Sequence, residues 1–504
     1  MKVKNEKKAG ILLSYLNVGV GMIVSLAYTP VMLRLLGQND YGVYQAASSI
    51  ISYLSLFTLG FSSAYMRFYA RYKTKEDNEG ISRLNSLFLL VFGIAAVMAF
   101  VSGLILSMKP QVIFGNKFTS EELNTSRILM ILMSFNMAVT FIDSVFAMYV
   151  NALEKFTFQR ILSLLSTVLR PTITLPLLIM GYGSVGLTVA STTVTLGVAI
   201  TDYYCAHKNK MKFSMGKPDI KLLKEIAVFS FFIFLTSLAG TMNSTIDRLL
   251  LSRYEGAGAV AVYEIGEKFN LYLMQFSIMI SAVFVPQINM MVAKKRENKE
   301  LTDLMIRIGR IQFILLAYVL GGFILVGKYF IGVYAGEGYD ESFRIAVMIM
   351  CASFIPYIQN IGIEIQKALN KHVFRSVIYF LIAIVNVLCS ILFIRMFGIS
   401  GAAIGTALSL LIGNVIIMNM YYHRGIHLEM SRFWKSMINL ILASLAALLP
   451  CIVWCTFRPV STIIDFVIIG IIFTIIYIVV MWRIGMNEDE KNMARNFLIK
   501  RTRR

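Results

Sequence analysis

The sequence predicts an all-α integral membrane protein with about fourteen transmembrane helices, arranged as two six-helix parallel repeats followed by two C-terminal helices. The first observation behind this prediction is composition. Hydrophobic residues make up 57% of the 504 residues and charged residues only 15%, whereas soluble domains carry about a quarter charged residues. Mean hydropathy is correspondingly high, at +0.70. The second observation is an internal repeat, which divides the apolar segments into two equivalent sets.

Apolar segments long enough to cross a bilayer follow one another along the chain, since a span needs about 20 mostly apolar residues. We expect them to be helices, because the bilayer core offers no water to satisfy an open strand edge. The short alternating segments typical of a membrane β-barrel do not occur. In order, the predicted spans are 11–33, 42–66, 84–106, 127–150, 161–181, 184–204, 225–250, 260–289, 311–334, 344–368, 373–395, 399–422, 434–456 and 461–482.

One series of motifs occurs twice, in the same order and at nearly the same spacing. Each copy has a short segment with lysine and phenylalanine, an apolar run, a Gly-x-x-Gly sequence and a tyrosine pair; the copies begin at Asn151 and Lys367. An even number of spans in each copy gives both the same orientation, and transporters built in this way place their substrate between the repeats. The sequence therefore predicts an N-terminal lobe at 1–210, a C-terminal lobe at 211–430, and helices 13 and 14 with a basic tail at 431–504.

Lysine and arginine gather in alternate loops, one of which is the basic stretch from Lys294 to Arg310. The positive-inside rule places these loops and both termini in the cytoplasm. A net charge of +20 would indicate nucleic acid as the partner of a soluble protein. Here the charges mark topology and contacts with anionic membrane lipids, and we expect no nucleic-acid partner. The first span lacks a small-residue cleavage site and is expected to remain in the protein.

No motif for catalysis or metal binding emerges. The five cysteines fall mostly in apolar runs and form no CxxC pair, as small buried hydrophobes do. Gly322–Tyr329 nearly matches a phosphate-binding loop, but Tyr329 replaces the Ser or Thr that binds Mg²⁺. The GxxxG spacing of Gly401–Gly405 indicates close helix packing. We therefore expect no enzyme, no cofactor and no metal.

Arg170 is the strongest single candidate for a functional residue. It lies midway along the fifth span, just before Pro171, which removes a backbone donor and bends the helix. An intramembrane charge is costly and usually faces a cavity or a partner. We interpret Arg170 as a cavity residue, in preference to an arginine satisfied by the carbonyls that the proline frees. A polar stripe in the second span suits a cavity wall, although packing alone would also allow it; it consists of Tyr44, Ser48, Ser52 and Ser55.

Two further groups of charges lie inside predicted spans. Lys268 is one turn from Glu264 and adjacent to Glu267 in the eighth span. A cavity cation and a self-neutralising helix pair are equally good interpretations of this group. Asp247 and Arg248 lie near the outer end of the seventh span, where an interfacial pair that extends toward the headgroups is the alternative.

Acidic residues are the candidates for ion coupling. Asp143 shares a helix face with Thr140 and Asn136, which could form a proton or cation site or an inter-helix hydrogen-bond network. Glu364 lies near Lys367 at the cytoplasmic end of the tenth span, where interfacial placement is the better interpretation. The deep cations suit an anionic amphiphile, because a phosphate head group takes bidentate hydrogen bonds from arginine.

Three stretches carry a family resemblance. Residues 30–44, from Pro30 through Arg34 to Tyr44, and residues 60–71 resemble the opening of Wzx-type polysaccharide and O-antigen repeat-unit flippases, and residues 243–254 resemble the helix 7–8 region of that family. The resemblance covers the whole chain. It implies the MATE-like fold of the multidrug/oligosaccharidyl-lipid/polysaccharide exporter (MOP) superfamily, with two six-helix lobes around a central cavity.

The resemblance also implies a function. The expected substrate is an undecaprenyl-pyrophosphate-linked oligosaccharide, moved from the inner to the outer leaflet of the bacterial cytoplasmic membrane for O-antigen, capsule or exopolysaccharide assembly. The cavity of the family is typically cationic, which is consistent with substrate contacts from Arg170, Lys268 and Arg248. A polysaccharide polymerase and chain-length machinery are further partners that such a role implies.

Two related functions remain as alternatives. A flippase for lipid II or a teichoic precursor would have the same fold. A cation-coupled multidrug antiporter would need acidic groups, for which Asp143 or Asp247 could serve, but the deep cations argue against it. A membrane enzyme lacks both large loops and a catalytic constellation.

Overall fold

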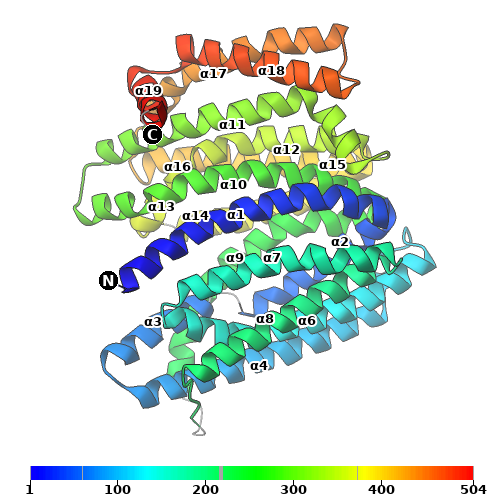
Figure 1. The fold of residues 1–504 in the computed structure, drawn as a ribbon, viewed down its shortest axis with the longest axis vertical. Helices are drawn as coiled ribbons and strands as arrows, with labels where there is room; N and C mark the ends of the chain where they lie inside the picture. The colour runs from blue at the N-terminus through cyan, green and yellow to red at the C-terminus, as the bar shows by residue number, and fades with distance from the viewer. Residues whose placement is uncertain (1, 59–60, 215–219, 372, 503–504) are drawn as a thin grey trace. The chain divides into compact units, whose positions relative to one another are not determined.

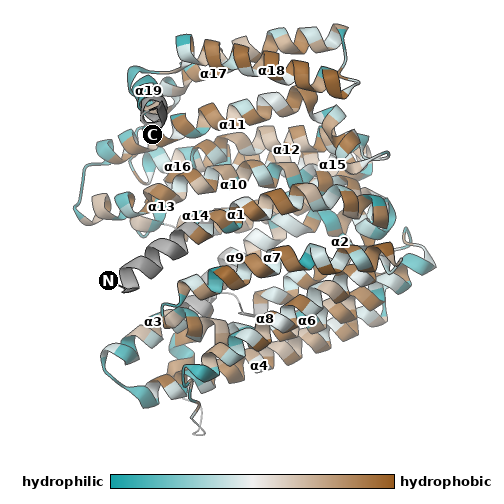
Figure 2. Cartoon of the chain, viewed as in Figure 1, coloured by the Kyte–Doolittle hydropathy of each residue, from teal (hydrophilic) through white to brown (hydrophobic). Residues whose placement is uncertain are grey.

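A computed structural model describes residues 2–58, 61–214, 220–371 and 373–502, and its regular elements over these ranges are all helical. Twelve helices of the described chain are long and apolar enough to cross a membrane. The prediction of an all-α integral membrane protein is therefore confirmed, while the count of fourteen spans stays a prediction. Figure 2 shows apolar residues along α17 and α18 and polar residues at helix ends and in the connecting loops.

Two predicted spans are not among the twelve helices. The segment 42–66 is divided, because α2 (Gln38–Leu54) ends in a 3₁₀ turn at Ser55–Thr58 before α3 (Phe61–Thr74) begins. The segment 225–250 lies within the single helix α9 (Ile220–Tyr254).

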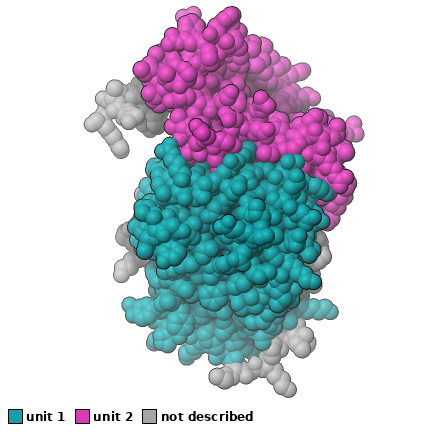
Figure 3. Space-filling model, turned by 90° about the vertical axis from the view of Figure 1, so that its right-hand side faces the viewer, with its two compact units in different colours: residues 1–262 teal, residues 263–504 magenta. Residues whose placement is uncertain are grey.

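Internal contacts divide the chain into two compact units, residues 1–262 and 263–504 (Figure 3). Helix α9 packs on α2 and α3 and so belongs to the first unit. The lobe boundaries at 210 and 430 stay predictions. The other helices of the first unit are α1 (Lys2–Leu36), α4 (Asn78–Met108), α5 (Pro110–Phe114), α6 (Ser120–Ala152), α7 (Phe156–Ile179) and α8 (Gly183–Lys208).

The first unit is built around the row α4, α6 and α8, which lie side by side, and α1 packs on α7 (Figure 1). Small residues allow these helices to approach closely. A Cβ on Gly103 of α4 would lie 2.3 Å from the Cβ of Ser134 on α6. Thr119 and Glu122 form a capping box that starts α6, since each side chain satisfies a backbone N–H of the first turn.

In the second unit α11 packs on α12 and α17, and α14 packs on α15. The predicted close packing of the GxxxG segment is confirmed: a Cβ on Gly401 would lie 2.0 Å from the carbonyl oxygen of Phe393. The helices of this part are α10 (Ala257–Ala293, which begins in the first unit), α11 (Asn298–Ala335), α12 (Asp340–Ile358), α13 (Asn360–Ala368), α14 (Val373–Phe397), α15 (Ile399–Leu410), a π-helical turn (Leu411–Ile417), α16 (Met418–Arg424), α17 (Met430–Phe457), α18 (Ile463–Val480), a second π-helical turn (Met481–Gly485) and α19 (Glu488–Thr502).

One predicted loop is in fact largely helical. The basic stretch from Lys294 to Arg310 was expected to be a loop, but α11 begins at Asn298 and includes Arg310. The near match to a phosphate-binding loop at Gly322–Tyr329 also lies inside α11, so its backbone N–H groups are used within the helix.

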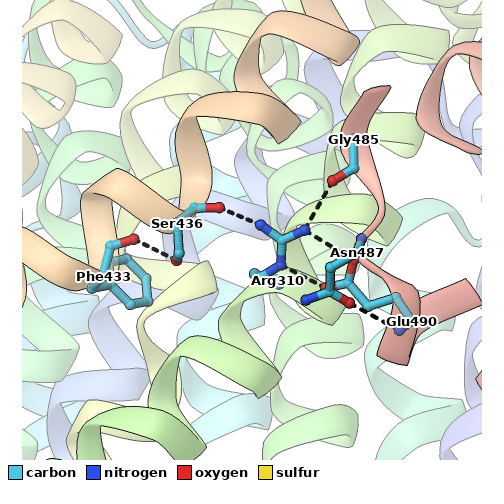
Figure 4. Close-up of polar contacts among 6 residues, drawn as sticks. All are labelled: Arg310, Phe433, Ser436, Gly485, Asn487 and Glu490. Atoms are coloured by element: carbon cyan, nitrogen blue, oxygen red, sulfur yellow. Dashed lines mark hydrogen bonds and ion pairs between the residues drawn. The ribbon is translucent and has the colours of Figure 1, made fainter. Parts of the chain in front are cut away.

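The C-terminal helix α19 is attached to the second unit by a buried ion pair (Figure 4). Arg310 Nε of α11 lies 2.6 Å from Glu490 Oε1, and Nη2 lies 2.9 Å from Oε2. The two side chains are only 7% and 9% exposed. Arg310 also donates to the carbonyls of Gly485, at 2.8 Å, and Ser436. Asn487 accepts a hydrogen bond from the Glu490 backbone N–H at 2.9 Å, which starts the helix.

Candidate functional site

A polar cavity of ≈ 320 Å³ lies among α2, α6, α7 and α8 of the first unit. Arg170 is the charged residue of its lining. Three members of the predicted stripe on α2 face the same cavity. The lining residues are Tyr44, Ser48, Ile51, Ser52, Met133, Asn136, Met137, Thr140, Arg170, Thr188, Ser191 and Thr195.

Arg170 lines this cavity from α7. Arg170 is exposed. Within the described part of the chain, its guanidinium makes no hydrogen bond or ion pair. The backbone carbonyl of Arg170 accepts a hydrogen bond from the Thr174 hydroxyl at 2.7 Å. The five N–H donors of the side chain are therefore available to a ligand.

The hydroxyl groups around Arg170 mostly donate to their own helices. Thr140 Oγ1 donates to the carbonyl of Asn136 at 2.9 Å, and Ser52 Oγ to that of Ser48 at 2.9 Å. On α8, Thr188 Oγ1 donates to a carbonyl one turn earlier at 3.0 Å. A hydroxyl that has donated its proton keeps oxygen lone pairs for a partner. The cavity thus combines the N–H donors of the Arg170 guanidinium with several hydroxyl oxygens that can accept hydrogen bonds.

Ser55 departs from the predicted stripe. It begins the 3₁₀ turn that follows α2, and its hydroxyl donates to the carbonyl of Ser52 at 2.7 Å. The helical spacing that aligned it with Ser48 ends at Leu54, so Ser55 is not part of the lining.

Asp143 lies beyond the cavity on α6. Its expected neighbours Asn136 and Thr140 line the cavity, whereas Asp143 is not part of the lining. Its Oδ1 is buried and makes no hydrogen bond with the described residues. Asp143 also interacts electrostatically with Asp202 of α8.

Asp202 is a candidate that the sequence analysis missed. It is buried and accepts a hydrogen bond at 2.6 Å from Gln159 Nε2 of α7. Asp202 lies within the predicted sixth span, 184–204, but the sequence analysis did not single it out. In the structure Asp202 lies within α8 (Gly183–Lys208), and the hydrogen bond from Gln159 connects it to α7.

The remaining predicted charges lie outside the cavity lining. Lys268, Glu264 and Glu267 are on α10 in the second unit, and Lys268 interacts electrostatically with Glu264 one turn earlier. This contact is the one expected of a helix pair. Lys268 thus belongs to the second unit, whereas Arg170 belongs to the first.

Arg248 and Asp247 are on α9. Arg248 Nη2 donates to the carbonyl of Ser244 at 2.7 Å, and Asp247 is buried. Glu364 forms an ion pair with Lys367 on α13, with Nζ and Oε1 2.8 Å apart. These contacts use part of the hydrogen-bonding capacity that a ligand would need.

Tight contacts within the first unit gather near the start of α2. A Cβ on Gly42 would lie 1.8 Å from the carbonyl oxygen of Ala257, so α2 crosses the turn between α9 and α10 with backbones touching. Gln38 Nε2 donates to the carbonyl of Gly258 at 3.3 Å. Asp40 accepts hydrogen bonds from the backbone N–H and the hydroxyl of Ser184, at 2.7 and 2.6 Å, where α8 begins.

These features define a multi-pass membrane protein of the helical-bundle class, with a charged residue in a polar cavity inside the bundle. Residues 8–292 match the family model described as polysaccharide biosynthesis protein, and the chain belongs to this family. The resemblance to polysaccharide biosynthesis proteins is thereby confirmed for the family, and similar solved structures confirm the fold that it implied.

Known proteins share the fold at low sequence identity. The chain is similar to a structure of the lipid II flippase MurJ in an inward closed conformation, with a TM-score of 0.75 and 16% identity over 93% of this chain and 98% of that chain. It is also similar to an inward-facing multidrug resistance MATE family transporter of the MOP superfamily, with a TM-score of 0.68 and 12% identity over 84% of this chain and 99% of that chain.

A curated relative is the probable low-salt glycan biosynthesis flippase Agl15 of Haloferax volcanii. It is 20% identical over 208 residues, which are 41% of this chain and 44% of the relative. The match thus spans less than half the length of that protein.

Proposed function

We propose that the protein is a flippase for lipid-linked glycans, which moves a polyisoprenyl-pyrophosphate-linked oligosaccharide across the cytoplasmic membrane for surface polysaccharide assembly. The observation that carries the proposal is the cavity in which Arg170 faces hydroxyl groups of α2, α6 and α8. Family membership supports a role in polysaccharide biosynthesis. Agl15 and MurJ, which are named as flippases, support this reaction class.

The cavity matches the two polar parts of such a substrate. The planar guanidinium of Arg170 can hold two phosphate oxygens at once. The lone pairs of the lining hydroxyls can accept hydrogen bonds from sugar hydroxyls. The isoprenyl chain needs neither group and would remain in lipid. Both termini would face the cytoplasm, and the role itself would be transport without catalysis.

The lining also distinguishes this function from the antiporter alternative. An antiporter of cationic drugs needs a carboxylate in the cavity, and the charged residue of this lining is Arg170. A flippase for lipid II or a teichoic precursor would use the same guanidinium, because all these substrates share the pyrophosphate or phosphate head. We propose that the oligosaccharide is a repeat unit of O-antigen, capsule or exopolysaccharide.

A deletion strain tests the function. Loss of surface polymer, together with lipid-linked repeat units accumulating on the cytoplasmic side of the membrane, would support the glycan flippase. Loss of viability on depletion, with surface glycan intact until lysis, would favour the lipid II or teichoic alternative. Unchanged glycan and lipid pools with increased drug sensitivity would contradict the proposal.

Gly42 allows a test of alternating access. We propose that the contact of α2 with the α9–α10 turn closes the outer end of the cavity and opens during transport. Gly42→Leu would add a side chain where a Cβ already lies 1.8 Å from Ala257 O, and such overpacking costs about 1–3 kcal/mol. We expect the variant to lose transport and to favour the outward-open state.

The measurement is labelling of a cysteine introduced at Ser48, in a chain whose five native cysteines are replaced. An impermeant thiol reagent added outside should label Ser48→Cys faster in the Gly42→Leu variant. Gly93→Leu is the matched control, because a Cβ there meets no atom within 4 Å. Equal labelling in both variants would show that this contact does not control access.

Asp143 and Asp202 are our candidates for ion coupling. Two carboxylates that interact inside a helix bundle can share a proton or a small cation. We expect Asp143→Asn and Asp202→Asn to remove the part of transport that depends on an imposed proton or sodium gradient, while protein level is unchanged. Asp489→Asn, at an exposed position on α19, is the control. Full gradient dependence in both variants would exclude this pair.

A further inference from the structure

A second polar pocket of the first unit, with a volume of ≈ 510 Å³, lies where α4 ends and α6 begins. Its lining includes two basic residues and three neutral polar residues, which are Lys109 and Arg127, and Gln111, Ser120 and Asn124. Among the described residues, no aspartate or glutamate lines this α4–α6 pocket. Its volume is typical of pockets that bind small molecules, and its lining is separate from that of the cavity proposed above for the substrate.

Lys109 reaches this pocket because a proline follows it. A residue before proline is biased away from helical backbone angles, so α4 ends at Met108 and Pro110 begins the short helix α5. Lys109 is exposed. Its ammonium group makes no hydrogen bond or ion pair within the ranges that the structure describes, so its three N–H donors are available.

Arg127 is oriented by the end of α4. Its Nε donates to the carbonyl of Ser107 at 3.2 Å, and Nη2 donates to that of Met108 at 3.5 Å. Carbonyls of the last helical turn have no partner within their own helix, so they hold the guanidinium in place. These two bonds use two of the five N–H donors of the side chain, and the others remain for a ligand.

The acidic residues near the pocket do not neutralise its two cations. Glu122 accepts a hydrogen bond from the Thr119 N–H at 2.8 Å, as part of the capping box of α6. Neither Glu121 nor Glu122 lines the pocket. Lys109 and Arg127 form no ion pair with a described residue. Since like charges repel, an anion that contacts both residues would be attracted to this position.

Neutral donors complete the pocket. Ser120, Asn124 and Arg127 follow one another at helical spacing on one face of α6. The Ser120 hydroxyl and the Asn124 amide make no hydrogen bond within the described part of the chain. Hydroxyl, amide, ammonium and guanidinium groups all donate hydrogen bonds, and a phosphate group offers several acceptor oxygens to such donors.

An apolar strip beside the pocket indicates which kind of anion would bind. Met108 lines the pocket and is 67% exposed. Ile105 and Val101 precede it at helical spacing on α4, and they are 60% and 45% exposed. This α4 strip, Val101, Ile105 and Met108, lies on a helix that is long and apolar enough to cross a membrane. It leaves apolar area for a hydrocarbon chain to cover, starting at the pocket.

We propose that the α4–α6 pocket binds the phosphate of one anionic phospholipid, whose acyl chain lies along the α4 strip. Lys109 and Arg127 would contact the phosphate oxygens. Asn124 and Ser120 would donate hydrogen bonds to the remaining oxygens of the head group. A soluble anion would use the pocket but not the strip, whereas a phospholipid uses both. The proposal does not depend on the proposed transport function.

Photo-cross-linking of the full-length protein in vesicles tests the proposal. The vesicles consist of phosphatidylcholine with a small fraction of phosphatidylglycerol that carries a diazirine in its acyl chain, and mass spectrometry maps the labelled residues. We expect this lipid to label the α4 strip more than phosphatidylcholine with the same diazirine chain. Lys109→Gln and Arg127→Gln should each lower the phosphatidylglycerol label about fivefold, as expected for one basic residue near the membrane surface. The phosphatidylcholine label should not change.

Lys117→Gln is the matched control, because Lys117 is exposed in the loop between α5 and α6 but lies outside the lining. Thermal unfolding shows whether each variant is folded. Lys109→Gln removes a side chain without a described contact, so it still tests the site if Arg127→Gln is unstable. Equal labelling by the two phospholipids, or an unchanged phosphatidylglycerol label in Lys109→Gln, would overturn the proposal.

Competition distinguishes the sources of the phosphate. Unlabelled phosphatidylglycerol should displace the label from the α4 strip. Displacement by inorganic phosphate would assign the pocket to a soluble anion. Stronger displacement by an equimolar polyprenyl pyrophosphate would assign it to the transported lipid. Either of these two results would overturn the assignment to a phospholipid of the membrane.

Discussion

The Arg170→Gln variant is expected to reach the membrane in normal amount but to lose surface polysaccharide. Hydrogen bonds to a charged group contribute about 1.5–3 kcal/mol each, so losing the guanidinium should weaken pyrophosphate binding by about 10- to 100-fold. The glutamine side chain is still polar and is smaller than the arginine that it replaces, so it adds no steric conflict to the cavity. The defect would therefore be one of binding and not of folding.

Arg170→Lys separates charge from geometry. Lysine keeps the positive charge but lacks the planar fork that holds two phosphate oxygens. We expect a partial defect, between those of the wild type and Arg170→Gln. Arg160→Gln is the matched control, since Arg160 is exposed at the start of the same helix. Normal surface polysaccharide in Arg170→Gln would remove Arg170 from the substrate site.

The Glu490→Gln variant is expected to show a large loss of stability. It leaves the buried guanidinium of Arg310 without its carboxylate, and breaking a buried ion pair in this way costs about 3–5 kcal/mol. We expect a lower midpoint of thermal unfolding in detergent and reduced protein in the membrane. Glu488→Gln removes the same charge from an exposed position two residues earlier and should have little effect.

A double variant separates the charges from the packing that they support. Arg310→Met with Glu490→Leu replaces both members of the pair by apolar residues, and such replacements are often neutral or stabilising. We expect its midpoint to lie well above that of Glu490→Gln. An unchanged midpoint in Glu490→Gln would mean that the pair does not hold α19.

Hydropathy and the repeated motifs were sufficient to predict the helical membrane fold, because both depend on local composition. The break in the second span was missed for a physical reason. Ser52 and Ser55 are polar and helix-compatible in the sequence, so nothing in the local composition marks the point at which α2 gives way to a 3₁₀ turn.

Arg170 could be identified from the sequence because a charged residue beside a proline is unusual within an apolar run. The residues that complete the cavity come from three other helices. The stripe on α2 was predicted as a cavity wall, whereas Asn136 and Thr140 of α6 were named only as neighbours of Asp143. Asp202 was missed although it lies in the predicted span 184–204, because its partner Gln159 is 43 residues away in the chain and the sequence does not link the two.

The pairing of Arg310 with Glu490 could not be found from sequence, since 180 residues separate the partners. Arg310 was included in a basic loop that the structure shows to be part of α11. Glu490 lies in a strongly charged C-terminal segment in which no residue stands out. Burial distinguishes this pair from the other charges, and burial depends on the packing of α11, α17 and α19.

The central claim is that the Arg170 cavity moves a lipid-linked glycan across the membrane. The most direct measurement uses purified full-length protein reconstituted in vesicles that contain a fluorescent polyprenyl-pyrophosphate-linked disaccharide. An impermeant glycosidase added outside reports how much of the inner-leaflet pool becomes accessible. The account predicts that wild-type vesicles expose the whole pool with time and that Arg170→Gln vesicles expose little more than the outer half. Equal exposure in wild-type, Arg170→Gln and protein-free vesicles would contradict it.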